Sequence, residues 1–455
     1  MQSPLPLFAH AQPDSIVAFR DGRAITARRF LRDARELAQR LPAGRNLLNL
    51  CTDRYRFIVA LAAGLLTGRC SLLPPTHAPE VIRQMSAFAP DLFCVTDDAD
   101  CTLELPLLFY READAEPEAV AGSAWSVPAI DAGQLAAYIF TSGSTGTPLP
   151  HRKTWGRLVR CVRIEAERLS LPPHCSILGT VPPQHMYGFE STVMLPLQSG
   201  AALDAGRPFF PADIAAALQL LPRPRVLVTT PVHLRSLLSA EMTLPALDLV
   251  VSATAMLARN VAREVERRYG APLLEIYGST ETGQIAARRS AFEEQWRLWD
   301  EVRLDFLDGR CRAQGGHVEQ PTPLADVIEI CDSQRFVLHG RSADMVNIAG
   351  KRSSIAYLNH QLNGIAGVLD GAFFVRDDVP ASIAGITRLA ALVVAPSLDA
   401  SAILQALRDR IDPVFLPRPL LLVDALPRNE TGKLPQHTLR ALVEQATARA
   451  PHLFA

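Results

Sequence analysis

The chain has 455 residues, of which 48% are hydrophobic and 20% charged, and this length favours two or three domains. Its 46 basic and 47 acidic side chains leave a formal net charge of −1. Nucleic-acid binding normally requires a basic excess on one face, so this balance argues against a nucleic acid partner. Only three basic residues are lysines, at Lys153, Lys351 and Lys433, and each raises the question of whether arginine could replace it.

The N-terminal residues lack a charged region followed by an apolar core, so we expect no secretory signal. The most apolar stretch, residues 57–68, is too short to span a bilayer and is expected to form a buried helix. The eight cysteines form no CxxC or other zinc-like pair. We therefore expect reduced cysteines in a cytoplasmic protein, without a structural zinc or a disulfide framework.

Helical and strand patterns alternate through most of the chain. An amphipathic helix is predicted over 26–41, where apolar residues share one face and arginines the other. A buried strand is predicted over 46–50, then a helix over 54–68 and a strand over 91–97. This order favours the α/β class, with a large N-terminal domain of mostly parallel sheets layered with helices.

Further along, strands are predicted over 225–231 and 247–254, and an amphipathic helix over 258–270 that Gly270 would end. Past about residue 340 the sequence pattern changes to that of a short, compact region. Its predicted elements are three strands and one helix, over 371–376, 388–395, 420–426 and 397–411. Such a piece suffices for a small α+β domain. We therefore predict one domain over residues 1–340 and a second over 341–455.

The first segment that carries chemistry is YIFTSGSTGTP at 138–148, where a strand runs into a loop of glycines and small hydroxyl residues. Small side chains allow successive backbone N–H groups to turn inward and hold phosphate oxygens. Hydroxyl donors come from Thr141, Ser142, Ser144 and Thr145. Neither GxxxxGK[ST] nor GxGxxG is present. A Ser/Gly hairpin or linker without a ligand is the alternative interpretation.

The second segment is LLEIYGSTETGQIA at 273–286, in which a buried strand ends in an aromatic residue, a glycine and then polar groups. Tyr277 can stack on a planar base, Thr280 can donate to a phosphate, and Glu281 can hold magnesium as a hard oxygen ligand. Taken alone, a glutamate in a polar loop is more often solvated than catalytic. Its pairing with the first segment favours a functional role.

Two more segments lie at the change of sequence pattern near residue 340 and beyond it. Residues 324–350 offer Asp326 and Arg341; an aspartate can accept both hydroxyls of a ribose, and an arginine can bind hydroxyl and phosphate oxygens. LPRNETGKLPQHTLR, at 426–440, places Lys433 on a turn after the last strand. A compact ammonium on a flexible stem is suited to reaching into a cleft formed by another domain.

In this order the four segments resemble those of the adenylate-forming, or AMP-binding, superfamily of acyl- and aryl-CoA synthetases, peptide-synthetase adenylation domains and luciferases. TSGSTGTP resembles the family's phosphate loop, YGSTETG its aromatic–acidic motif, and PRNETGK its C-terminal lysine motif. Asp326, with Gly-Arg at 340–341, resembles its ribose and hinge region. SATAML (252–257) sits at the family's adenine-side strand, and PPQHMYGFE (182–190) beside its acyl pocket. The resemblance spans about residues 20–440.

The resemblance implies a two-step reaction. An acid's carboxylate attacks the α-phosphate of Mg·ATP to give an acyl-adenylate and pyrophosphate, and a thiol then displaces AMP to give a thioester. In this scheme the loop at 142–146 holds the β- and γ-phosphates, and Glu281 with magnesium offsets the charge that repels the anionic nucleophile. Lys433 stabilises charge on the carboxylate and α-phosphate oxygens. The small domain then swings about the hinge at 341–344 and removes the lysine.

The residues that the resemblance implies fall into four groups. The catalytic residues are Lys433, Glu281, Thr280 and His185, with Glu281 as the Mg²⁺ ligand. The ATP-binding residues are Thr141, Ser142, Gly143, Ser144, Thr145, Gly146, Lys153, Ser252, Ala253, Thr254, Glu275, Tyr277, Gly278, Ser279, Asp326 and Arg341. The acid-pocket residues are His185, Met186, Tyr187, Phe189, Thr230 and Ser252. The hinge residues are Ser342, Ala343 and Asp344.

The chain departs from the family pattern at two places. Most members have lysine directly after the phosphate-loop proline, where this chain has Leu149. We predict that Lys153, expected at the start of the next helix, takes over the contact with the outgoing pyrophosphate; the alternative is a surface lysine. The hinge reads GRSAD where GRxDD is common, and Ala343 at the pivot is expected to change rates. Lys351 follows the hinge and either meets a carrier-protein phosphate or is solvated.

The large domain is short for this family, and with the P-x-x-K-x-W run it resembles compact acyl- or aryl-carrier-protein ligases of bacterial aryl-polyene-type pigment pathways, a form of secondary metabolism. This favours an aryl acid, such as a hydroxybenzoate or a cinnamate-like acid, delivered to the phosphopantetheine thiol of an acyl carrier protein or CoA. The alternatives are a medium- or long-chain fatty acyl-CoA synthetase and a non-catalytic nucleotide-binding scaffold. The expected cofactors are ATP and Mg²⁺, with no nucleic acid and no membrane span.

Overall fold

The computed structural model describes residues 3–112, 125–142, 148–341, 345–348, 351–375 and 389–426, together with residues 428, 434 and 442. Several predicted site residues lie outside these ranges: Gly143, Ser144, Thr145, Gly146, Ser342, Ala343, Asp344 and Lys433. Ser142 and Arg341 are described by their backbone alone. Within the described residues, no helix combines the length and apolar character that crossing a membrane would require.

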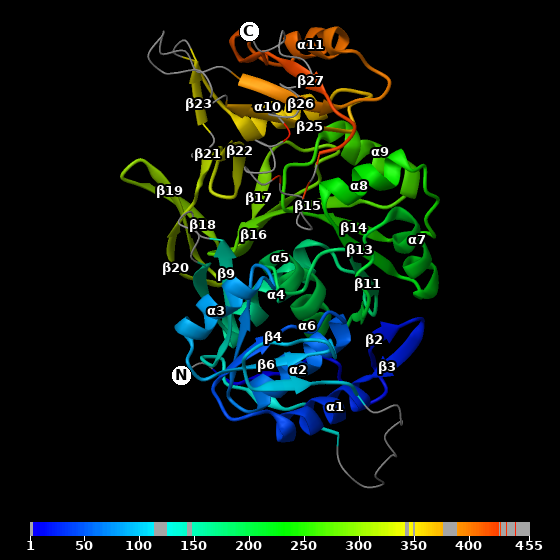
Figure 1. Ribbon diagram of the computed structural model, residues 1–455, viewed down its shortest axis with the longest axis vertical. Coiled ribbons are helices and arrows are strands. Elements are labelled where there is room, and N and C mark those ends of the chain that lie inside the picture. Colours follow the sequence, from blue (N-terminus) through cyan, green and yellow to red (C-terminus); the bar gives the residue numbers. More distant parts are fainter. Residues whose placement is uncertain are drawn as a thin grey trace.

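A six-stranded sheet occupies the lower part of the molecule as drawn in Figure 1, in the order β10-β9-β5-β4-β6-β7. Its strands are β4 (Asn46–Asn49), β5 (Cys70–Leu73), β6 (Leu92–Thr96), β7 (Leu107–Phe109), β9 (Leu135–Ser142) and β10 (Pro148–Thr154). All neighbours run parallel except β9 and β10, which form an antiparallel pair. The helices of this part are α1 (Ala27–Arg40), α2 (Arg54–Leu66) and α3 (Pro79–Phe88).

An eleven-stranded sheet has the order β21-β22-β17-β16-β15-β14-β13-β11-β12-β2-β3. Its strands are β2 (Ile16–Arg20), β3 (Arg23–Thr26), β11 (Ser176–Gly179), β12 (Ala202–Asp204), β13 (Arg225–Thr229), β14 (Leu249–Ser252), β15 (Leu273–Ser279), β16 (Gly283–Arg288), β17 (Trp296–Leu298), β21 (Asp326–Ile330) and β22 (Arg335–Arg341). The run from β2 through β15 is parallel, and the flanking strands pair antiparallel.

The helices of this second layer are α4 (Trp155–Arg168), α5 (Met186–Phe189), a π-helical turn (Glu190–Met194), α6 (Leu195–Ser199), α7 (Pro211–Leu220), α8 (Pro231–Ser239) and α9 (Arg259–Tyr269). As predicted, α9 ends at Gly270, which has φ +66° and adopts the left-handed conformation that glycine tolerates. Two small sheets complete the large part: β1 (Leu5–Pro6) with β8 (Ala129–Ile130), and β18 (Arg303–Leu307), β19 (Arg310–Gly315) and β20 (Val318–Pro323).

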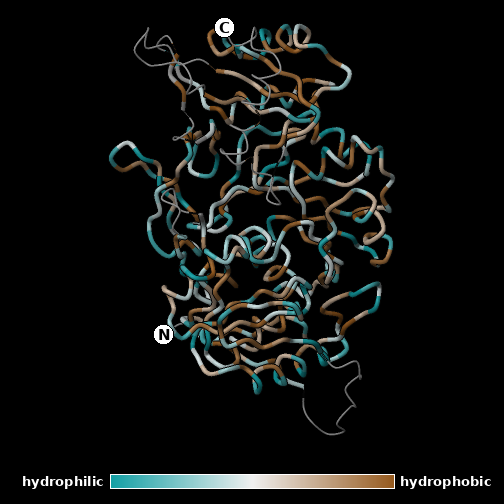
Figure 2. Tube along the Cα trace, viewed as in Figure 1, coloured by the Kyte–Doolittle hydropathy of each residue, from teal (hydrophilic) through white to brown (hydrophobic). Residues whose placement is uncertain are grey.

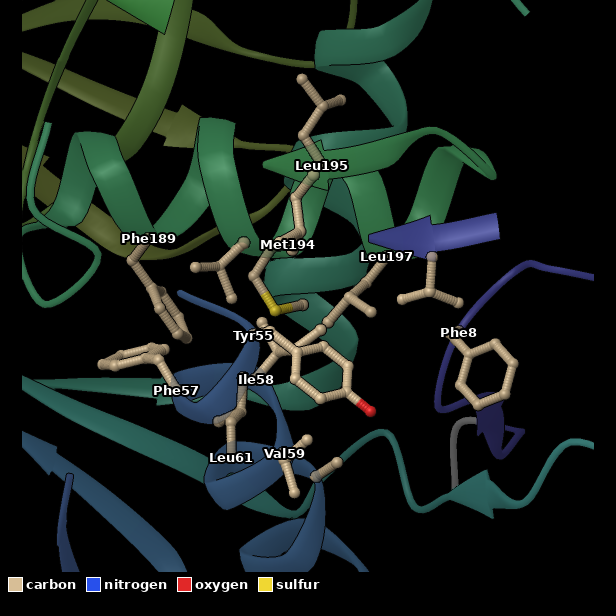
Figure 3. Close-up of a cluster of buried hydrophobic side chains, with 14 of the residues drawn as sticks. Phe8, Tyr55, Phe57, Ile58, Val59, Leu61, Phe189, Met194, Leu195 and Leu197 are labelled. Carbon is tan, nitrogen blue, oxygen red and sulfur yellow. The ribbon is translucent and has the colours of Figure 1, made fainter. Parts of the chain in front are cut away.

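The main hydrophobic core lies where α2 meets the segment that carries α5 and α6 (Figure 3). The rings of Phe57 and Phe189 point toward each other there, with centroids 6.4 Å apart. Helix α2 is buried along nearly its whole length, as its uniform apolar sequence predicted. Figure 2 shows how hydropathy is distributed in the lower part of the molecule: the strands are hydrophobic, whereas the outer helices carry hydrophilic turns.

The small C-terminal part has its own hydrophobic core at the top of Figure 1. Its elements are β23 (Met345–Ile348), β24 (Lys351–Ser354), α10 (Ile355–Asn363), β25 (Asp370–Val375), β26 (Leu389–Val394), α11 (Ala400–Arg408) and β27 (Leu420–Leu422). The predicted α/β class, with a large and a small part, is therefore confirmed. The exact division at residue 340 stays a prediction.

Candidate active site

The hairpin of β9 and β10 brackets the predicted phosphate loop. Thr141 pairs with Leu149 across the hairpin, so the strand ends stand on either side of residues 143–147. Leu149, at the position where the family carries lysine, is 52% exposed. Two residues on, and so on the same face of the strand, the His151 Nε2 atom lies 2.9 Å from the Thr141 hydroxyl and 3.8 Å from a Glu281 carboxylate oxygen. Sequence reasoning missed His151, although its i+2 spacing from Leu149 was a usable signal.

Glu281 occupies the tight hairpin between β15 and β16. Gly278 and Gly283 approach so closely that a Cβ on Gly278 would lie 2.3 Å from the Gly283 carbonyl oxygen, so the turn requires glycine there. The pKa of Glu281 lies below its usual value, because hydrogen bonds from its own backbone N–H and the Ser279 hydroxyl and the charges of His151 and Lys153 outweigh partial burial. A half-exposed, ionised carboxylate is the donor that a hard cation such as Mg²⁺ prefers.

Lys153 lies near the end of β10, and α4 begins only at Trp155. The prediction that Lys153 opens a helix is therefore wrong, because the antiparallel pairing with β9 continues through Thr154. The alternative of a surface lysine is also wrong, because Lys153 is only 8% exposed. Its Nζ donates to the Glu281 backbone carbonyl at 3.2 Å. Burial lowers the pKa of Lys153, against the opposing charge of Glu190 and other neighbours.

The predicted nucleotide-binding residues gather at the ends of β14, β15 and β21. The Tyr277 hydroxyl donates to Asp326 Oδ2 at 2.7 Å, and Asp326 pairs in register with Arg341 across β21 and β22. Ser252 ends β14 beside β15, and Ala253 and Thr254 follow it directly. Thr280 is half-buried in the turn that precedes Glu281. The Tyr277–Asp326 hydrogen bond therefore brings the start of β21 close to the end of β15, where Thr280 and Glu281 follow.

Glu275 departs from its predicted role in ATP binding. It is 1% exposed, and its carboxylate accepts hydrogen bonds from Leu257 N (2.8 Å), Arg288 Nε (2.8 Å) and the Ser290 hydroxyl (2.6 Å). Both oxygens are thus engaged within the protein, which leaves no accessible oxygen for a nucleotide. Through these hydrogen bonds Glu275, on β15, instead links the chain that follows β14 to β16 and the residues after it.

The predicted acid-pocket residues separate into two sets. Phe189 belongs to the core with Phe57 (Figure 3), so the prediction that it faces the acid is corrected. The Tyr187 hydroxyl donates to the carbonyls of Thr229 and Val251, both at 3.1 Å, and Thr230 bonds to His233 at 2.8 Å.

Among the predicted acid-pocket residues, Met186 lines a cavity, as described below. His185 is half-buried and occupies the N-cap position of α5 without a side-chain capping hydrogen bond. Ser252 is fully buried, and its hydroxyl has no partner among the described residues.

A cavity of about 270 Å³ lies beside Glu281, between α4, the β15–β16 hairpin and β20. Its rim carries the exposed or half-exposed side chains Arg152, Glu281 and Glu319. Its interior is lined by side chains at most 8% exposed: Lys153, Leu158, Cys161, Met186, Glu190, Thr282 and His317. Five of these interior residues were missed from the sequence: Leu158, Cys161, Glu190, Thr282 and His317. The only signal was a glutamate inside the otherwise uncharged run 186–197.

Two buried glutamates, Glu190 and Glu165, lie close to each other in this region. The Cys161 thiol donates to Glu190 Oε1 at 2.9 Å, while the Ser191 hydroxyl donates to Glu165 Oε1 at 2.7 Å and accepts from Gln284 at 2.8 Å. Burial raises the pKa of Glu190 to about 7 and that of Glu165 to about 8. Glu165 is therefore largely protonated at neutral pH in the folded protein.

The pH dependence of stability should reveal Glu165. In the unfolded chain this carboxyl ionises near its usual pKa of 4.5, whereas in the folded protein it holds its proton up to about pH 8. Its contribution is therefore fully present below pH 4.5 and is lost as the pH rises to 8. Between pH 5.5 and 8.5 the free energy of unfolding should therefore fall in the wild type. It should fall less in Glu165→Gln, by a difference on the order of a few kcal/mol.

Urea unfolding at the two pH values checks this expectation. The matched control is Glu167→Gln, two residues further along the same helix and exposed, which should leave the pH dependence unchanged. Equal pH dependence in the wild type and Glu165→Gln would contradict the assignment.

Comparisons with known proteins agree with this arrangement. The family model described as AMP-binding enzyme matches residues 7–335. A 4-coumarate–CoA ligase of Rhodobacter capsulatus is 30% identical over 303 residues, covering 64% of this chain and 73% of the relative. A 3-hydroxybenzoate/4-hydroxybenzoate–CoA ligase of Thauera aromatica is 24% identical over 362 residues, covering 68% of this chain and 66% of the relative.

Solved structures share the fold over nearly the whole chain. An anthranilate CoA ligase in complex with anthranoyl-AMP superposes with a TM-score of 0.80 at 15% identity, covering 98% of this chain and 99% of the other. An o-succinylbenzoate CoA synthetase of Bacillus subtilis gives a TM-score of 0.78 at 17% identity, covering 96% and 99%. The resemblance drawn from the four sequence motifs is thus confirmed: the chain belongs to the AMP-binding enzyme family and is an acid–thiol ligase.

Proposed function

We propose that this enzyme activates an aryl carboxylic acid with ATP and transfers the acyl group to a phosphopantetheine thiol. The observation that carries the proposal is the convergence of groups from both large sheets. Thr141 and His151 come from the six-stranded sheet, whereas Glu281 and the Tyr277–Asp326 pair come from the eleven-stranded sheet. A hydroxyl, an ionised carboxylate and an aromatic–acidic pair are suited to phosphate, a cation and a nucleoside respectively.

In the proposed chemistry, the acid carboxylate attacks the α-phosphate and releases pyrophosphate, and a thiol then displaces AMP. Glu281 would hold Mg²⁺, which supplies positive charge beside the phosphates when bound. The Asp326 carboxylate, oriented by the Tyr277 hydroxyl at 2.7 Å, would accept the ribose hydroxyls. Lys433 and the hinge residues Ser342, Ala343 and Asp344 lie outside the described residues, and their roles rest on the sequence motifs alone.

Two findings support an aryl acid. The relatives described above are named for 4-coumarate and for hydroxybenzoates. The cavity beside Glu281 has a volume of only about 270 Å³ and carries buried polar side chains such as Glu190 and His317, which disfavours a medium- or long-chain fatty acid. We further propose a carrier protein as the acceptor, with CoA as the alternative, in the bacterial cytoplasm and in secondary metabolism.

ATP–pyrophosphate exchange with a panel of benzoates, cinnamates and fatty acids tests the proposal, because it reports adenylation and acid class together. We expect exchange with aryl acids above that with fatty acids, followed by transfer to holo carrier protein in preference to free CoA. Exchange with fatty acids alone would overturn the acid class. Measurable ATP binding without exchange for any acid would favour the scaffold alternative.

Lys153 provides a separate prediction within the proposed site. Because its ammonium donates to the Glu281 backbone carbonyl and adds positive charge beside that residue, Lys153→Ala should lower kcat/KM for adenylation by about tenfold or more. Lys351→Ala is the matched control, because Lys351 is exposed and pairs with Asp412. An unchanged kcat/KM in Lys153→Ala would refute a role in this step.

A further inference from the structure

We propose that the acid's ring occupies the cavity beside Glu281 and that Glu190, in its interior, selects acids with a hydrogen-bond donor on the ring, a hydroxyl or amino group. This inference rests on the proposed function and adds to it a residue that determines specificity. The cavity opens next to Glu281 and has a volume of about 270 Å³. An acid bound there would keep its carboxylate near the nucleotide site and direct its ring substituent inward.

The backbone at Gly283 leaves room for this interior. Gly283 has φ +74°, and a Cβ there would lie 2.8 Å from Glu190 Oε1 and 3.4 Å from the Cys161 sulfur. Any larger residue would press against the buried carboxylate in a conformation that L side chains rarely adopt. Glu190 also begins the π-helical turn Glu190–Met194, a rare irregularity that often marks functional positions.

Two buried side chains of the cavity, Glu190 and His317, carry polar atoms that make no hydrogen bond among the described residues. Glu190 is 1% exposed, and its Oε1 accepts from the Cys161 thiol while its Oε2 has no partner among the described residues. His317 is 4% exposed, and neither ring nitrogen makes a hydrogen bond of full geometry in the same part of the chain, although the Gln284 backbone is close enough to raise its pKa slightly. Buried polar atoms without partners are rare and costly, so such a group is expected to bind something.

The chemistry of these atoms defines the substituent. A carboxylate oxygen accepts a hydrogen bond, so Glu190 Oε2 calls for a donor on the acid. Burial lowers the pKa of His317 to about 3, so its neutral ring offers one donor and one acceptor at physiological pH. A hydroxyl can donate to Glu190 and accept from His317 at once, and an amino group can donate to both. An unsubstituted ring would leave Glu190 Oε2 and the His317 ring nitrogens without this additional partner.

The test compares acids that differ only at one position: 4-hydroxybenzoate, 4-aminobenzoate and benzoate, and 4-hydroxycinnamate and cinnamate. We expect the wild type to favour the donor-bearing acid of a series by about tenfold or more in kcat/KM for pyrophosphate exchange. The hydroxy and amino arms show which donor is preferred. In Glu190→Met the ratio should fall toward one, because the unsubstituted acid no longer leaves a carboxylate unpaired.

Glu165→Met is the matched control, since Glu165 is equally buried on α4 but does not line the cavity. It should lower stability while keeping the wild-type ratio. If aryl acids are activated and the ratio of kcat/KM between donor-bearing and unsubstituted acids is the same in the wild type and Glu190→Met, the inference is overturned. The proposed function would still stand. Absence of exchange with every acid would overturn the proposed function and the inference with it. Glu190→Gln keeps the shape of the side chain and removes its charge. A ratio between those of the wild type and Glu190→Met would show that charge, and not a loss of fold, sets the preference.

Discussion

Replacing Arg288 with methionine is expected to lower the free energy of unfolding by about 3–5 kcal/mol, because it leaves the Glu275 carboxylate buried without its ion partner. The Arg288 Nε atom donates to Glu275 at 2.8 Å, and the two side chains are 7% and 2% exposed. The guanidinium also lies 4.3 Å from the centre of the Trp296 ring, a contact that methionine replaces without its charge. The loss therefore combines an unpaired charge with a lost cation–π contact.

Arg289→Met is the matched control for this prediction. Arg289 is the next residue and also pairs with a glutamate, Glu266, but it is 45% exposed, and such pairs contribute at most about 1 kcal/mol. Chemical denaturation of both variants measures the difference. The double variant Glu275→Leu/Arg288→Met should recover part of the stability, because it removes the stranded charge. A loss in Arg288→Met no larger than in Arg289→Met would show that the pair is not a structural clamp.

The same ion pair shows where sequence reasoning stops. The segment LLEIYGSTETG predicted a strand ending in a functional turn, and β15 with the Glu281 hairpin confirms that strand and turn. The local pattern does not reveal that Glu275 faces Arg288 and Ser290, because these partners come from β16 and the chain beyond it. A carboxylate in a functional motif can thus serve the fold while its neighbour six residues away faces the site.

Much of the fold was predictable because its signals are local. The alternation of apolar strands with amphipathic helices gave β4, α2, β6, β13, β14 and α9 close to their observed bounds. Lys153 was misplaced because PHRKTW has no period that separates a strand end from a helix start, and pairing with β9 decides the matter. The same register places His151 next to Thr141 and close to Glu281. Which residues of two strands pair cannot be read from a single sequence.

The acid pocket was the least predictable part. Within residues 186–190, Met186 and Glu190 line the cavity whereas Phe189 packs into the core. Met186 and Phe189 are both large and apolar, so hydrophobicity could not separate the residue that lines the cavity from the one in the core, and the helix phase depends on contacts with α4 and β16. The exception was Glu190, whose charge in an otherwise uncharged helix is unfavourable without a partner.

Replacing Lys433 with alanine is expected to lower kcat/KM for adenylation by about a hundredfold or more, since it removes the charge proposed to stabilise the carboxylate and α-phosphate oxygens. The same motif is anchored by Arg428, which forms a two-point ion pair with Asp370 at the start of β25, with distances of 2.6 and 2.8 Å. Arg235, from α8 of the large part, approaches the same carboxylate at 3.9 Å. Arg428, five residues before Lys433, therefore shares the Asp370 carboxylate with a cation from the large part of the molecule.

Two further variants sharpen this prediction. Lys433→Arg keeps the charge but replaces a compact ammonium with a wide planar group, so it should recover little of the adenylation rate. Asp370→Asn leaves Lys433 intact and weakens its anchor, so it should cause a smaller loss. Thioester formation from supplied acyl-adenylate should be affected far less in Lys433→Ala, because the proposed swing removes the lysine before that step. A loss below tenfold in adenylation, or equal losses in both half-reactions, would refute the assignment of Lys433 to the first step.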